Sequence, residues 1–216
     1  MTKIYIVRHC EAVGNIKRMF QGLTDLDITE LGTKQLKALE KRFSSIQIDR
    51  VLSSPLLRTR KTAKAIIGNK NIELEIEQGL IELDGGVIEG KTYDDIYKEF
   101  PDFKDMWQNH PENFAPENGE TMPAAYDRIW NTVLKIAKEN KGKTVACASH
   151  GGVIRCLNCR LIKNDITKMR EVPFGYNTAV TLIEFDDKLN YKVVFFDDAS
   201  HITEDLMNKA AIIPTK

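Results

Sequence analysis

The chain has 216 residues, a length that is sufficient to bury one sizeable core. Hydrophobic residues make up 42% of it and charged residues 29%, as in ordinary globular proteins. Lys and Arg together number 31, as do Asp and Glu, so no overall field attracts nucleic acid or an anionic membrane. No apolar run approaches the roughly 20 residues that span a bilayer, the start lacks the apolar stretch of a secretory signal, and four cysteines do not make a disulfide scaffold. We therefore expect a cytoplasmic protein that binds neither nucleic acid nor membranes, with assembly into a homodimer left open.

The first third of the chain alternates strand and helix patterns. Residues 3–7 form a short β-branched and aromatic run that stops at Arg8 and His9, which is typical of a buried strand. Residues 29–43 repeat leucines at helical spacing behind a threonine cap, and residues 50–53 predict a second strand. A helix then follows from Pro55 to about residue 67.

The middle of the chain predicts a wall of loops and helices. A strand at 72–76 leads into a glycine-containing loop over 79–92. Helices at 93–100 and 121–138 are separated by a stretch rich in Pro and Asn. We interpret residues 77–140 as a helical lid or wall within a single domain that covers 1–216.

The last third completes the sheet. Residues 144–149 form the strongest buried strand and end at His150 and two glycines, before a helix to about residue 161. Two late strands are expected at 178–185 and 192–196, and residues after about 205 are expected to form a loosely attached tail. This order predicts an α/β fold, a three-layer α/β/α sandwich with a mostly parallel central sheet that binds its ligand at the carboxyl ends of the strands.

Cationic and donor side chains gather at those strand ends. His9 and His150 each follow a buried strand, Arg8 precedes His9, and Arg58 starts the helix after a further strand. Four such groups around one pocket repel one another unless an anion fills it, and the planar fork of arginine matches phosphate oxygens. The sequence therefore predicts a local phosphate site.

At these residues the chain resembles the histidine phosphatase superfamily, also called phosphoglycerate mutase-like. Its small-molecule branch, which includes α-ribazole phosphatases and broad-specificity phosphatases, is the most similar. The matching segments cover nearly the whole chain in order: Val7-Arg8-His9-Cys10-Glu11 with Asn15, Gln21-Gly22, Ser53-Ser54-Pro55-Leu56-Leu57-Arg58, Leu80-Ile81-Glu82, Asn118-Gly119-Glu120-Thr121 and Ser149-His150-Gly151-Gly152.

The resemblance implies a histidine acid-type phosphatase that hydrolyses phosphomonoesters of small metabolites without a metal or cofactor. His9 would be the nucleophile that forms a phosphohistidine, and Glu82 the general acid and base. Arg8, Arg58 and His150 would surround the phosphoryl oxygens. The substrate-binding set would add the side chains and backbone of Asn15, Gln21, Gly22 and Gly151.

Other chemistries have weaker support in the sequence. The pair Cys156 and Cys159 lies inside an expected buried helix, with no second pair to complete a zinc site. Residues 85–92 satisfy the G-x-x-x-x-G-K-[ST] phosphate-loop pattern of nucleotide hydrolases, but no clean strand precedes them and Glu89 would set a negative charge beside the phosphates.

Two alternatives stay within the resembled family. The family usually has glycine where Cys10 stands, and this side chain would narrow the pocket, tilt His9 or add an oxidisable thiol, which leaves a non-catalytic phosphate-binding module open. A mutase-type phosphoryl transfer is the other, although 89–93 lacks the Arg- and Tyr-containing segment of those enzymes. The substrate would be selected by the wall between 110 and 119, where the aromatic candidates are Phe103, Trp107, Phe114 and Tyr126.

Overall fold

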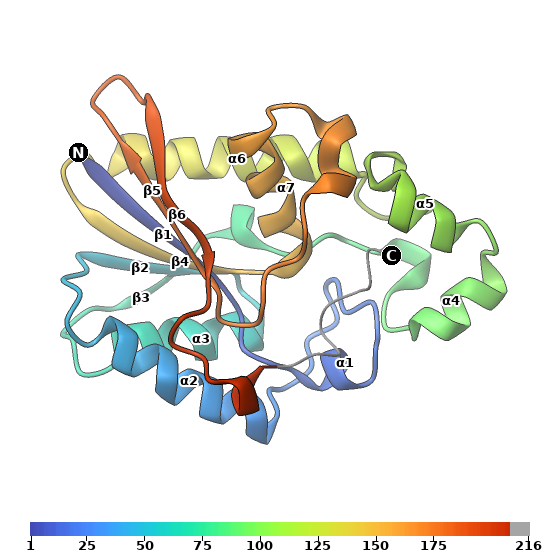
Figure 1. Ribbon diagram of the computed structural model, residues 1–216, viewed down its shortest axis with the longest axis horizontal. Helices are drawn as coiled ribbons and strands as arrows, with labels where there is room; N and C mark the ends of the chain where they lie inside the picture. Colours follow the sequence, from blue (N-terminus) through green and yellow to red (C-terminus); the bar gives the residue numbers. More distant parts are fainter. Residues whose placement is uncertain (208–216) are drawn as a thin grey trace.

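The computed structural model describes residues 1–207. A six-stranded sheet runs in the order β3-β2-β4-β1-β5-β6, with helices on both faces and a helical cap beyond one end (Figure 1). The strands are β1 (Thr2–Arg8), β2 (Arg50–Ser53), β3 (Leu74–Ile76), β4 (Thr144–Ser149), β5 (Val180–Phe185) and β6 (Tyr191–Asp198). The α-helices are α1 (Val13–Ile16), α2 (Glu30–Phe43), α3 (Leu57–Ile67), α4 (Tyr93–Glu99), α5 (Phe103–Asn109), α6 (Met122–Glu139) and α7 (Gly151–Ile162).

The sheet is mixed, and its parallel part confirms the expected α/β sandwich. β1 pairs in parallel with β4, β4 with β2, and β2 with β3. β5 and β6 are antiparallel to their neighbours and form one edge. All six strands lie where the sequence predicts them, with ends that differ by a few residues. The carboxyl ends of β1, β4 and β2 therefore lie side by side.

Alternate side chains of the strands enter two separate cores. Ile4 and Ile6 of β1 pack on the face covered by α6, α7 and the cap, while Tyr5 and Val7 pack on the face covered by α2 and α3. This period of two is the normal geometry of a strand buried on both faces. It explains why β1 is an almost continuous apolar run up to Arg8.

Hydrogen-bonding caps fix where the long helices start. The Thr29 side chain accepts from the Gly32 amide at the start of α2, and the Thr121 side chain accepts from the Ala124 amide at the start of α6. Each cap satisfies one of the free amides of a first helical turn. α1 and α5 are too short and irregular to show a helical period, so the sequence does not predict them.

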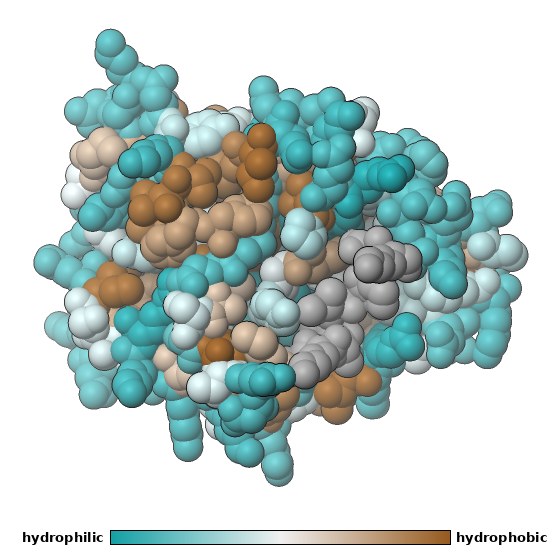
Figure 2. All heavy atoms as spheres, in the orientation of Figure 1, coloured by the Kyte–Doolittle hydropathy of each residue, from teal (hydrophilic) through white to brown (hydrophobic). Residues whose placement is uncertain are grey.

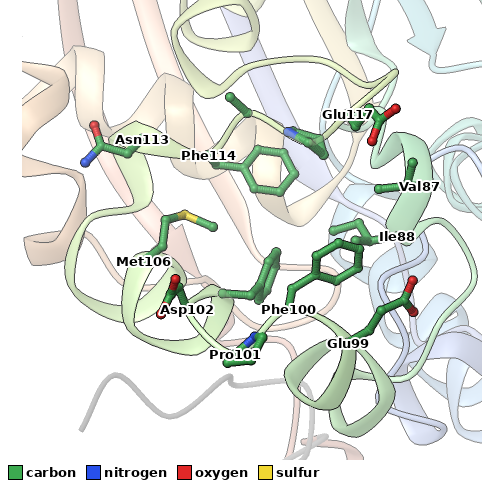
Figure 3. Close-up of a pocket in the computed structure, with 13 residues that line it drawn as sticks. Val87, Ile88, Glu99, Phe100, Pro101, Asp102, Met106, Asn113, Phe114 and Glu117 are labelled. Carbon is green, nitrogen blue, oxygen red and sulfur yellow. The ribbon is translucent and has the colours of Figure 1, made fainter.

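The cap contains a pocket of about 470 Å³ between α4, α5 and the loop at 113–117 (Figure 3). Phe103 and Phe114, which are two of the four expected wall aromatics, line it; Trp107 stacks on Phe103. Tyr126 lies elsewhere, under the guanidinium of Arg160. None of the predicted phosphate-binding residues lines this pocket, so it is separate from their site.

Figure 2 shows hydrophilic residues around the periphery and apolar side chains gathered over the β5–β6 part of the face. Val194, which lies on the edge strand β6, is 44% exposed. Among residues 1–207, no helix is long and apolar enough to cross a membrane.

Candidate active site

The two predicted histidines meet because their strands are neighbours. Arg8 and Ser149 are register partners at the ends of β1 and β4, and the His9 amide donates to the Ser149 carbonyl. The rings of His9 and His150 lie 5.3 Å apart between centroids. Both side chains are almost completely buried. The convergence predicted from the sequence is therefore present.

The hydrogen bonds of His9 define which of its ring nitrogens can react. Nδ1 lies 2.6 Å from the carbonyl oxygen of Cys10. A carbonyl oxygen only accepts, so Nδ1 carries the proton in this contact and the lone pair of a neutral ring is on Nε2. Asn177 supports the same segment by donating from Nδ2 to the His9 carbonyl at 2.9 Å. The ring is thus oriented with a nucleophilic nitrogen.

His150 is held by residues that follow β2. Its Nε2 lies 2.7 Å from the Ser54 hydroxyl, and its Nδ1 accepts from Nε of Arg58 at 3.2 Å. Because the guanidinium only donates, Nδ1 is the acceptor and Nε2 carries the proton of a neutral ring. Both ring nitrogens are therefore bonded within the protein at the carboxyl ends of β2 and β4, with the Nε2 proton directed at the Ser54 hydroxyl.

The guanidinium of Arg58 is fixed by carbonyls rather than by carboxylates. Its terminal nitrogens donate to the Thr24 and Gly22 carbonyls at 2.9 and 2.8 Å. The backbone of Gly22 has a φ of 40°, a conformation that favours glycine. Only 1% of Arg58 is exposed, so its positive charge stays concentrated in the pocket.

Glu89 braces that loop and argues against the phosphate-loop interpretation of 85–92. Its carboxylate accepts from the amides of Leu23, Thr24 and Gly85 at 3.0, 3.2 and 2.7 Å. Within the segment 85–92, the Gly85 amide is thus occupied by the Glu89 carboxylate, and the Gly86 amide donates to the Asp84 carboxylate at 2.9 Å. No strand directly precedes Gly85 in the described part of the chain, and residues 193–197 belong to an antiparallel edge strand.

Arg8 extends its guanidinium beneath the start of α7. Nη1 donates to the Gly175 carbonyl, while the buried Nε donates to no protein group within residues 1–207. A β-carbon on Gly151 would lie 3.1 Å from the guanidinium carbon of Arg8. The guanidinium therefore lies close to the N-terminus of α7, where the backbone itself favours anions, and a side chain at position 151 would crowd it.

Glu82 lies against the same helix N-terminus. Its carboxylate accepts from the amides of Leu83, Gly152 and Val153, each at 3.0 Å. A β-carbon on Gly152 would lie 2.8 Å from Oε1 of Glu82. The predicted general acid and base is thus held at a defined position on α7, next to the strand end that carries His150.

The pocket keeps its histidines neutral. Burial lowers the pKa of His9 well below its ordinary value, and the charges of Arg58 and Arg8 lower it further. The pKa of His150 is lowered by the same causes, burial first and Arg58 second. Burial also lowers the pKa of both arginines, although guanidinium keeps its proton under all ordinary conditions. The site is therefore a buried cluster of two guanidinium groups and two neutral imidazoles.

Asn15 and Gln21, the two remaining substrate-binding candidates, contact neighbouring residues of their own segment. Oδ1 of Asn15 accepts from the Ala12 amide at 2.9 Å, which closes the turn before α1. Gln21 packs directly on Gly14, and its buried Oε1 accepts from no described group. Both residues lie on the segment that leads from His9 to Arg58.

The cysteines give no sign of redox or metal chemistry. Burial raises the pKa of the Cys10 thiol to about 12, which favours the protonated form, and the Cys10 amide donates to the Thr62 hydroxyl of α3 at 3.1 Å. Cys156 and Cys159 are buried free thiols, each bonded to a different partner. The described residues contain no cluster of metal ligands.

The sequence analysis did not predict the residues before β5 that hydrogen-bond to Arg8 and His9. Gly175 and Asn177 precede β5 and bond Arg8 and the His9 backbone, yet neither lies near a recognisable motif. Arg155 donates to the Val172 and Met169 carbonyls, and its guanidinium lies over the Phe174 ring, so its contacts join α7 to the segment before β5.

The sheet order, the paired histidines and the buried arginines place the chain among α/β proteins with a cationic cluster at the strand ends. The sequence profile of the histidine phosphatase superfamily (branch 1) matches residues 4–198, and the chain belongs to that family. Phosphoserine phosphatase 1 of Hydrogenobacter thermophilus is 31% identical over 191 residues, 88% of this chain and 90% of that protein. Phosphoglycerate mutase-like protein 4 of Arabidopsis thaliana is also 31% identical, over 94% and 87%. The solved structure of Bacillus stearothermophilus YhfR has a TM-score of 0.88 and 30% identity, with 93% and 99% covered.

Proposed function

We propose that the protein hydrolyses phosphomonoesters of small metabolites through a phosphohistidine at His9. The observation that carries this proposal is the arrangement around Nε2 of His9. This nitrogen has a free lone pair when Nδ1 is bonded to the Cys10 carbonyl, and the buried His9 ring is close enough to the buried Arg58 and Arg8 to feel their charges. A neutral nucleophile surrounded by fixed positive charge suits attack on a phosphoryl group.

The first half-reaction transfers the phosphoryl group to the protein. Nε2 of His9 forms the new N–P bond while the bond to the ester oxygen breaks, and Glu82 in its protonated form gives that oxygen a proton. Arg8 and Arg58 stabilise the charge on the phosphoryl oxygens, and His150 adds a donor when its Nε2 proton turns from the Ser54 hydroxyl to a phosphoryl oxygen. The products are the free alcohol and the phosphoenzyme.

The second half-reaction returns His9 to its starting state. Glu82 is now a carboxylate and takes a proton from water as the water oxygen attacks phosphorus. The N–P bond breaks, inorganic phosphate leaves, and the proton taken from water restores the acid for the next cycle. One carboxyl group thus serves both steps.

The relatives support phosphatase chemistry and also keep a second candidate. The name of the Hydrogenobacter relative describes a phosphatase of a small phosphorylated amino acid, whereas the Arabidopsis relative is described as mutase-like. A mutase would return the phosphoryl group to a second hydroxyl of a phosphoglycerate. Release of inorganic phosphate, compared with formation of an isomeric phosphate ester, distinguishes the two reactions.

The test compares wild-type protein with His9→Ala on an aryl phosphate. We expect steady release of inorganic phosphate by the wild type, a loss of at least about a thousandfold in His9→Ala, and no change of the wild-type rate with EDTA. Strong EDTA inhibition that magnesium reverses would reject the metal-independent mechanism. A His9→Ala protein with wild-type turnover would reject the nucleophile.

A further inference from the structure

One face of α6 supports the loop that carries Glu82. Arg128, Thr132 and Lys135 are spaced as i, i+4 and i+7, so they project from the same side of the helix. A β-carbon on Gly79 would lie 2.0 Å from the Thr132 hydroxyl, which means that loop and helix touch there. Lys135 pairs with Glu77 at 2.8 Å at the start of the same loop.

Arg128 makes the contact nearest to the proposed acid. Its Nη1 donates to the carbonyls of Gly79 and Ile81 at 2.8 and 2.9 Å. The Ile81 carbonyl belongs to the peptide unit that joins Ile81 to Glu82, so this bond fixes the backbone from which the carboxylate projects. Ser149 adds a bond from its hydroxyl to the Leu80 carbonyl at 2.7 Å.

Glu120 fixes the guanidinium in turn. Nε and Nη2 of Arg128 donate to the two carboxylate oxygens of Glu120 at 2.7 and 2.6 Å, a bidentate pair. The side chains of both residues are mostly buried. The Glu120 amide also bonds the Asp84 carbonyl, on the other side of Glu82. The Glu120–Arg128 pair therefore holds the acid loop on both sides.

We propose that Arg128 is a positioning residue for the reaction and that Glu120 orients it, so that the pair determines how well Glu82 donates a proton to the leaving group. This inference rests on the proposed function. A general acid contributes only where its proton reaches the leaving oxygen at hydrogen-bond distance. A loosened loop would therefore slow substrates that need protonation and spare those that do not.

The test measures kcat/KM for propyl phosphate, a poor leaving group, and for dinitrophenyl phosphate, a good one. Arg128→Lys keeps the charge but cannot bind Glu120 and both carbonyls with one ammonium group. We expect kcat/KM to fall about 10- to 100-fold for propyl phosphate and to change little for dinitrophenyl phosphate. Glu120→Gln, which weakens the pair without removing Arg128, should shift the same ratio in the same direction.

Arg50 provides a matched control at the opposite end of the sheet. It binds Glu75 with the same bidentate fork and Asn140 with its third nitrogen, at the start of β2. Arg50→Lys should leave the ratio of the two kcat/KM values unchanged, whatever it costs in stability. Thermal unfolding of each variant identifies any protein that fails to fold. If Arg128→Lys does not fold, the ratio of the two kcat/KM values in Glu120→Gln tests the proposal in its place.

A Glu82→Gln background separates positioning from other effects. Once the acid is absent, Arg128→Lys should add no further preference for the good leaving group, because the two changes act on one interaction. Three results would overturn the inference. The first is an equal loss of kcat/KM for both substrates in Arg128→Lys, and the second is an unchanged ratio of the two kcat/KM values in both Arg128→Lys and Glu120→Gln. The third is that Arg128→Lys shifts this ratio as far on the Glu82→Gln background as it does in the wild type. Activity that survives His9→Ala would instead reject the proposed function itself.

Discussion

At the residue scale, the proposed mechanism depends on the neutrality of the buried histidines. His9 is surrounded by burial and by the charges of Arg58 and Arg8, all of which disfavour imidazolium. An imidazole in water is half protonated near pH 6.5, so it would lose much of its nucleophilic form in mild acid. The buried ring keeps its lone pair under those conditions, provided that Nδ1 keeps its bond to the Cys10 carbonyl.

The ring protonation of His9 and His150 can be followed by NMR in protein with labelled histidines. Because the pKa of both side chains is lowered in the folded state, their signals should not titrate as the pH falls through about 6.5. The same difference predicts that stability is greatest above that pH and falls below it, since the unfolded chain then binds protons that the native pocket rejects. A titration midpoint near 6.5 for either ring in the folded protein would contradict this description of the pocket.

At the element scale, the position of Glu82 depends on loops that contact one another through backbone atoms. Gly86 has a φ of 51°, and a β-carbon there would lie 2.0 Å from the Glu117 carbonyl. This junction joins the segment after Glu82 to the segment before Glu120. Neither loop shows the hydrophobic periodicity of a helix or a strand. The contact between the two loops could therefore not be predicted from the sequence of either one.

Substitution of Gly86 tests how tightly these loops are joined. Gly86→Ala should destabilise the protein by more than 2 kcal/mol, since it combines left-handed backbone strain of about 1 kcal/mol with an overpacked contact. Gly142→Ala is the matched control: its φ is 76°, but nothing lies within 4 Å of the added carbon, so only the strain remains. Equal midpoints for the two variants in urea unfolding would show that the Gly86 contact carries no energy.

At the scale of the whole molecule, the parallel sheet could be predicted because β1 and β4 are apolar runs that end abruptly in histidine. Because parallel strands have their carboxyl ends at the same edge of a sheet, the two histidines could be expected to lie close together. The antiparallel direction of β5 and β6 could not be predicted, because pairing direction leaves no mark on short apolar runs. The chemistry-bearing residues His9, Arg58, Glu82 and His150 were predicted from motifs, whereas Gly175, Asn177 and Arg128 act through backbone carbonyls or amides and carry no local signature.

The most direct test of the account is to trap the covalent intermediate. Wild-type protein mixed rapidly with dinitrophenyl phosphate and denatured in base should carry one phosphoryl group that is stable in base and labile in acid, on the peptide that contains His9. The same experiment with His9→Ala should yield unmodified protein and no turnover. Steady phosphate release by the wild type without any such phosphoprotein, or a phosphoryl group found on another residue, would contradict the central claim that His9 is the nucleophile.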